Sequence, residues 1–65
     1  MNEIICSYTI FESEMEAMND LLAMFSLNNV EVVNEEQIDR LVRLDISFPN
    51  REVQSFFDNA FTEHM

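Results

Sequence analysis

The hydrophobic pattern of the chain predicts strand, helix, strand, strand and helix, in that order. The first segment, Glu3 to Phe11, is rich in β-branched and aromatic residues, which favours a strand with both faces partly covered. Alternate side chains of a strand share a face, so two sets are expected. One set is Ile4, Cys6, Tyr8 and Ile10, and the other is Ile5, Ser7, Thr9 and Phe11.

The next segment has the spacing of an amphipathic helix. Its apolar residues recur three or four positions apart and form one stripe: Met15, Met18, Leu21, Leu22 and Phe25. Ser13, followed three residues later by Glu16, fits a capping box at the start of this helix. We expect Asn28 and Asn29 to stop the helix, because Asn is the best residue after Gly for a left-handed stop and the chain has no Gly.

The middle of the chain predicts a β-hairpin. Val30 opens a short apolar run, and apolar and polar residues alternate from Ile38 to Phe48, although Arg40 and Leu41 break the pattern. We interpret Val30–Glu35 and Ile38–Phe48 as the two strands of the hairpin. A short helix over Glu35–Arg43 stays open as an alternative, because Ile38, Leu41 and Val42 also have helical spacing and Asn34 could cap it.

The last segment predicts a second helix, from about Arg51 to Glu63. Pro49 ends the preceding strand and Asn50 is a good N-cap. The apolar stripe consists of Val53, Phe56, Phe57, Ala60 and Phe61. The sum is one α+β domain over residues 1–65, with order β-α-β-β-α, in which two helices cover one face of a small, mostly antiparallel, three-stranded sheet. We expect the helix aromatics in its core: Phe25, Phe56, Phe57 and Phe61.

Composition excludes several classes of protein. The absence of Gly excludes phosphate-binding glycine loops, and the single cysteine and single histidine, Cys6 and His64, exclude a disulfide framework or a zinc site within one chain. No signal peptide and no bilayer-spanning segment is recognisable. The serines have no plausible triad, and so small a domain leaves little interior for a catalytic pocket. We therefore expect a cytoplasmic protein that is not an enzyme and has no cofactor and no metal.

Thirteen acidic residues against three arginines give a net charge of −10. Glu12, Glu16 and Asp20 are four residues apart and are expected to line one helix flank, with Glu14 nearby. A second set surrounds the predicted hairpin turn: Glu31, Glu35, Glu36 and Asp39. These eight residues are our candidate partner-binding residues. Such charge disfavours binding to nucleic acid or anionic lipid, and it favours either high solubility or recognition of a basic surface.

As a compact acidic module, the whole chain resembles the small acidic inhibitors that phages and mobile elements encode against host defence, among them anti-CRISPR and anti-restriction proteins. The part most similar to a row of phosphates is Glu12, Glu14, Glu16 and Asp20. The resemblance implies a DNA mimic that acts in the cytoplasm of a bacterial host. We expect a monomer rather than a homodimer, because a high net charge keeps small proteins apart. Such a protein would bind the basic surface of a CRISPR effector or similar nucleic-acid enzyme and block target DNA.

A second function stays open. Phe11, Val33 and Leu41 should project from the sheet face that the helices leave uncovered, unless a helix over Glu35–Arg43 covers that face. An exposed apolar patch is typical of a protein interaction surface. The alternative to a DNA mimic is therefore a small interaction module, an adaptor or an antitoxin-like regulator, that binds through this apolar sheet face.

Overall fold

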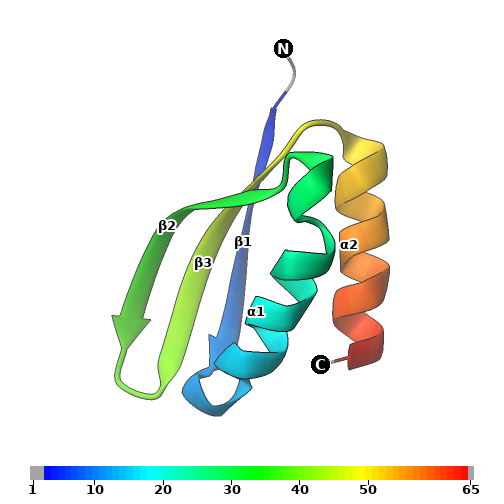
Figure 1. Cartoon of the computed structure of the whole chain (residues 1–65). Coiled ribbons are helices and arrows are strands. Elements are labelled where there is room, and N and C mark those ends of the chain that lie inside the picture. Colours follow the sequence, from blue (N-terminus) through cyan, green and yellow to red (C-terminus); the bar gives the residue numbers. More distant parts are fainter. Residues whose placement is uncertain (1–2, 65) are drawn as a thin grey trace.

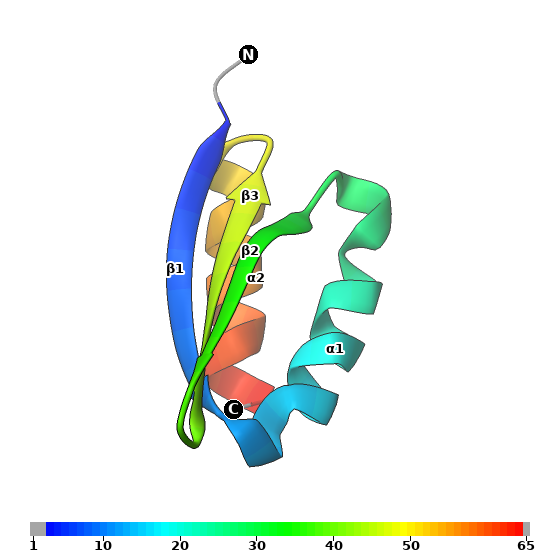
Figure 2. The same cartoon turned by 90° about the vertical axis from the view of Figure 1, so that its left-hand side faces the viewer.

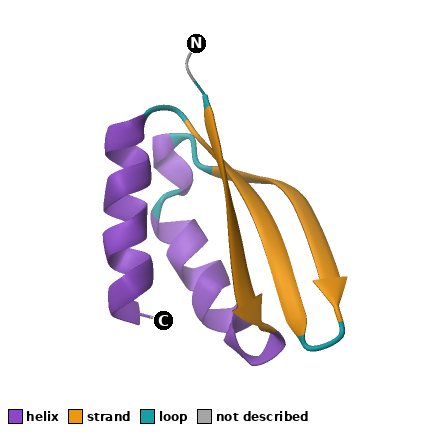
Figure 3. Ribbon diagram, turned by 180° about the vertical axis from the view of Figure 1, so that it is seen from behind, coloured by secondary structure: helices purple, strands orange, loops and turns teal. Residues whose placement is uncertain are grey.

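The computed structural model describes residues 3–64 and confirms the predicted α+β architecture (Figure 1). The strands are β1 (Ile4–Phe11), β2 (Glu31–Ile38) and β3 (Leu41–Phe48), and they form an antiparallel sheet of order β1-β3-β2. The helices are α1 (Met15–Met24) and α2 (Arg51–His64), and the 3-10 turns η1 (Glu12–Glu14) and η2 (Ser26–Asn28) flank α1. Both helices lie on one side of the sheet and leave the other side open (Figures 2 and 3).

The core lies between the central strand β3 and the two helices. Every second residue of β3 is buried, from Val42 to Phe48, because β3 has a strand on each side and helices over one face. The other buried apolar residues are Ile10, Met18, Leu21, Val30 and Phe57. Phe57 is fully buried, and the centre of its ring lies 5.4 Å from that of Tyr8 and 5.3 Å from that of Phe48. One aromatic cluster therefore joins α2 to two strands.

The hairpin is confirmed, but its turn lies later than predicted. The segment Glu35–Arg43 is strand, turn and strand, so the helical alternative is wrong. The turn falls at Asp39 and Arg40, where Asp39 takes a left-handed conformation with φ of 60°. This turn is the reason why Arg40 and Leu41 break the alternation. Ile38, which we grouped with Val42, belongs to β2 instead and is 58% exposed.

The start of the first helix differs from the prediction. Ser13 and Glu16 form no capping box, because the chain first makes the 3-10 turn η1 and α1 begins only at Met15. Glu14 closes this turn by accepting a hydrogen bond from the backbone N–H of Phe11 at 2.9 Å. At the other end, Asn29 has the predicted left-handed conformation, with φ of 62°, but α1 stops earlier, at Met24.

The second helix is confirmed, but the prediction of which of its residues face the core is wrong at one position. Asn50 caps it as predicted, since its Oδ1 accepts a hydrogen bond from the backbone N–H of Val53 at 2.9 Å. Phe57 is fully buried, whereas Phe56 is 60% exposed, so the prediction that Phe56 lies in the core is wrong. Neighbouring residues of a helix point about 100° apart. A stripe centred on Phe57 therefore turns Phe56 outward.

Candidate partner-binding surface

Most of the predicted acidic residues lie at one end of the molecule, where η1 and the β2–β3 turn meet (Figures 1 and 3). The backbone N–H of Glu12 donates a hydrogen bond to the backbone carbonyl of Arg40 at 2.7 Å, which holds η1 against the turn. We call the carboxylates around this junction the acidic pole. Its members are Glu12, Glu14, Glu16, Glu35, Glu36 and Asp39. Residues far apart in the sequence thus form one charged end of a molecule that is 34 Å long.

Two of the eight candidates lie outside the acidic pole. Glu31 begins β2, at the opposite end of that strand, and Asp20 lies one helical turn beyond Glu16 on α1. The predicted flank of Glu12, Glu16 and Asp20 is also wrong in one member. Glu12 belongs to η1 rather than to α1, and its carboxylate accepts a hydrogen bond from the side-chain amide of Gln37 on β2. Only Glu16 and Asp20 share a helix flank.

The acidic pole is not confined to one face of the sheet. Glu35 lies opposite Leu44, which is buried under the helices, whereas Glu36 lies opposite Arg43 and points to the uncovered side. Both residues are exposed, because β2 extends beyond the cover of the helices. Within residues 3–64, four carboxylates of the pole accept no hydrogen bond and form no ion pair: those of Glu16, Glu35, Glu36 and Asp39. The oxygen atoms of these four carboxylates are therefore available to contact a partner.

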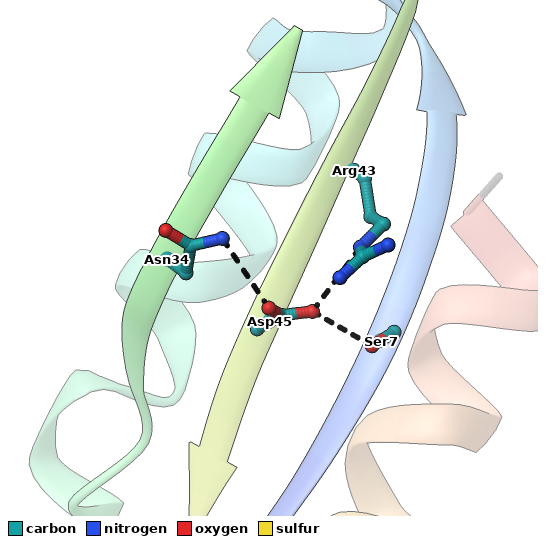
Figure 4. Close-up of polar contacts among 4 residues, drawn as sticks. All are labelled: Ser7, Asn34, Arg43 and Asp45. Atoms are coloured by element: carbon teal, nitrogen blue, oxygen red, sulfur yellow. Dashed lines mark hydrogen bonds and ion pairs between the residues drawn. The ribbon is translucent and has the colours of Figure 1, made fainter.

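The middle of the uncovered sheet face is polar and internally paired (Figure 4). Asp45 of β3 accepts hydrogen bonds from Ser7 of β1 at 2.7 Å and from Asn34 of β2 at 3.4 Å. The Nε atom of Arg43 lies 3.6 Å from Asp45 Oδ1, which is the one ion pair of the described residues. The hydrogen bond from Ser7 is the main cause that lowers the pKa of Asp45. Arg43 is thus paired with Asp45, although it also lies opposite Glu36 of the acidic pole.

An apolar row crosses the same face next to the acidic pole. Leu41 of β3 lies directly opposite Phe11 of β1 on one side and Ile38 of β2 on the other. All three are on the side away from the helices, because their neighbours Ile10 and Val42 are buried beneath the helices. The exposed fractions are 60% for Phe11, 42% for Leu41 and 58% for Ile38. We call these three residues the apolar row.

The apolar row differs in one residue from the sequence prediction. Phe11 and Leu41 face away from the helices as predicted, but Val33 is half-exposed at a bulge in β2, between Val32 and Asn34. Val33 therefore lies several residues along β2 from the row. Ile38 takes its place, and only the position of the turn reveals this. Sequence reasoning also missed the pairing of Asp45, which needs three strands in register.

Residues 3–64 form shallow hollows, of which two are relevant to the site, and one of these touches the acidic pole. Phe11, Glu12, Ser13 and Arg40 line a hollow of about 320 Å³, where the apolar row meets the pole. The other, of about 290 Å³, lies between the helices and is lined by Ala17, Asp20, Leu21, Met24 and His64. No group of three or more His, Cys, Asp or Glu within residues 3–64 is arranged to hold a metal ion.

No protein-family model matches this chain, and comparisons with curated proteins and with solved structures return no match. Neither helix of the described residues combines the length and the apolar character that crossing a membrane requires. The functional argument therefore depends on the surface itself: an end crowded with carboxylates, with an apolar row beside it.

Proposed function

We propose that the protein is a non-enzymatic inhibitor that binds the basic, nucleic-acid-binding surface of a host defence complex and thereby excludes DNA. The observation that carries this proposal is the acidic pole, in which six carboxylates from η1, α1, β2 and the turn meet at one end of the molecule. In this proposal the protein acts as a monomer, because two copies with a net charge of −10 repel each other.

The charge balance of the acidic pole supports this proposal. Two arginines accompany the six carboxylates: Arg40 in the turn and Arg43 opposite Glu36, and Arg43 is paired with Asp45. Solubility alone is served by a net charge of about 2 to 8 for a small domain, and this chain exceeds that range. Charge gathered at one end also costs self-repulsion that an even distribution would reduce. An oppositely charged groove offsets that cost and accelerates association, as electrostatic steering does in general.

Displacement of DNA tests the proposal. Purified CRISPR effectors and restriction enzymes are each bound to fluorescent target DNA, and the release of that DNA is measured as the protein is added. We expect the protein to release DNA from at least one complex, and to lose about tenfold or more in potency as salt rises, because the attraction is electrostatic. Retention of DNA by every complex, at low salt and high protein concentration, would contradict the proposed function.

Two double variants separate the acidic pole from net charge. Glu16→Lys/Glu36→Lys removes charge from the pole, and Glu31→Lys/Glu52→Lys removes the same charge elsewhere. Each pair reverses one first-turn helix glutamate and one glutamate of β2. Because a lysine at position 36 would lie opposite Arg43, whereas Glu31 lies opposite Ser47, urea unfolding of both variants checks that each is folded under the assay conditions. We expect the first variant to lose most of its potency and the second to keep most of it. Equal losses would show that net charge, rather than the pole, displaces DNA.

A further inference from the structure

The apolar row is a contiguous patch and not a set of scattered side chains. Residues directly opposite in an antiparallel sheet have Cβ atoms about 5 Å apart, so Leu41 lies beside Phe11 on one side and beside Ile38 on the other, across three strands. Ile5, which is 61% exposed on the same face, lies at the far end of β1 and is separated from the row by Ser7 and Thr9. The sheet face therefore has one apolar end and a polar middle.

Charged residues of the acidic pole adjoin this row directly. Glu12 follows Phe11 in the chain and Asp39 follows Ile38, while Glu36 lies on the same face, two residues before Ile38 on β2. Phe11, Glu12 and Arg40 also line the same hollow of about 320 Å³. Apolar side chains and carboxylates thus form one continuous surface at this end.

The negative charge of the acidic pole indicates which kind of partner can bind to this surface. A second copy of the chain would bring two acidic poles together, and nucleic acid or an anionic lipid surface would be repelled in the same way. A purely cationic strand would meet the carboxylates but leave Phe11, Leu41 and Ile38 in water. The remaining occupant is a protein surface in which apolar side chains are enclosed by Lys and Arg.

We infer that the apolar row and the acidic pole together form one docking surface for a partner protein with an apolar centre and a basic rim. This inference rests on the proposed function, because it takes the acidic pole as one half of the surface. In this arrangement the carboxylates accelerate association, and the apolar row determines how long the complex lasts. The arrangement is typical of interfaces, which have an apolar centre and a polar rim.

A pair of synthetic peptides tests the inference. One is a Lys-rich peptide with a central pair of Leu residues, and the other has Ser in place of Leu at the same charge. Affinities are measured by titration while the backbone amide signals are followed by NMR. We expect the Leu peptide to bind about tenfold more tightly, and to shift the signals of Phe11, Ile38 and Leu41, because burying a leucine is favourable.

Threonine variants test whether the apolar row causes the preference for the Leu peptide. Phe11→Thr/Leu41→Thr keeps residues that favour strands and should bind the two peptides equally. Ile5→Thr, at a residue of similar exposure on the same face, should keep the tenfold preference. Circular dichroism establishes that each variant is folded. A preference that survives in Phe11→Thr/Leu41→Thr, or that is absent from the original chain, would overturn the inference.

The same titrations also test the proposed function, and the result that would contradict it differs from the result that would contradict the docking surface. If Glu16→Lys/Glu36→Lys binds the Ser peptide as well as the original chain does, the acidic pole does not attract a basic partner. The difference between the Leu and Ser peptides reports the apolar row independently of that result. Shifted signals confined to the hollow at Ala17 and Met24, between the helices, would also overturn the docking surface.

Discussion

At the scale of single residues, Tyr8 connects the sheet to α2 through its aromatic ring and its hydroxyl group. Its ring packs at 5.4 Å from Phe57 and 5.1 Å from Phe61, measured between ring centres. Its hydroxyl donates a hydrogen bond to the carboxylate of Asp58, to which Gln54 also donates. Burial, and then the hydrogen bond to Asp58, raise the pKa of Tyr8 well above its usual value of 10.0.

The raised pKa predicts a loss of stability in alkali. Between pH 10.0 and the folded pKa, the unfolded chain releases the phenolic proton while the folded chain keeps it, so the free energy of unfolding falls as pH rises. Urea unfolding below and above pH 10.0 measures this slope, and Tyr8→Phe should remove it. Both proteins keep every other titratable group, so the comparison isolates Tyr8.

The absorbance of the phenol provides an independent check. Tyr8 is the chain's single tyrosine, and the chain has no tryptophan, so near-ultraviolet absorbance reports its ionisation alone. We expect no change in the folded protein near pH 10.0 and an abrupt change when the protein unfolds at higher pH. Ionisation of the folded protein at the ordinary phenol pKa would contradict the contact with Asp58.

At the scale of elements, the pattern predicted every strand and helix but not all of their ends. Strands with strict alternation, such as β3, and a helix with a clear cap, such as α2, are specified locally. The β2–β3 turn was misplaced because its left-handed residue is Asp39, and no Gly in the chain signals such a turn. The acidic pole was predicted as two separate sets, since sequence separation hides the hydrogen bond between Glu12 and Arg40.

Helix α2 illustrates how far a helical pattern determines burial. Phe56 and Phe57 are equal candidates for the core in the sequence, but only Phe57 lies at the centre of the stripe. Phe57→Leu should lower the free energy of unfolding by about 1–2 kcal/mol, and Phe56→Leu should change it by less than about 0.5 kcal/mol. Urea denaturation of the two variants measures the difference. Similar losses in both would show that Phe56 is also packed.

The charges of β2 have a structural consequence as well as a proposed function. β2 is an edge strand, and its exposed glutamates, Glu31, Glu35 and Glu36, oppose pairing with the edge of another sheet. This protection explains acidic residues anywhere along β2. It does not explain those on η1 and α1, which lie on no sheet edge. Glu12 and Glu14 are in turn bonded within the chain. Glu16 and Asp39 are therefore the members of the acidic pole that neither edge protection nor an internal hydrogen bond accounts for.

At the scale of the whole molecule, the fold brings six of the thirteen acidic residues together at one end. The turn after β2 and the turn after β1 lie at the same end, so their carboxylates add their fields within one region. The opposite end holds Glu31 and the start of α2. A basic groove would therefore meet one end of the molecule first, and the apolar row lies beside that end.

The most direct test of this polarity maps the electrostatic potential of the folded protein without a partner. Small paramagnetic probes, one cationic and one neutral, are added separately, and the extra relaxation of each backbone amide signal is measured by NMR. We expect the cationic probe, relative to the neutral one, to enhance relaxation most at residues 12–16 and 35–40, with weaker effects at residues 29–32 and 50–53. An even enhancement over the whole surface would contradict the acidic pole and the function proposed from it.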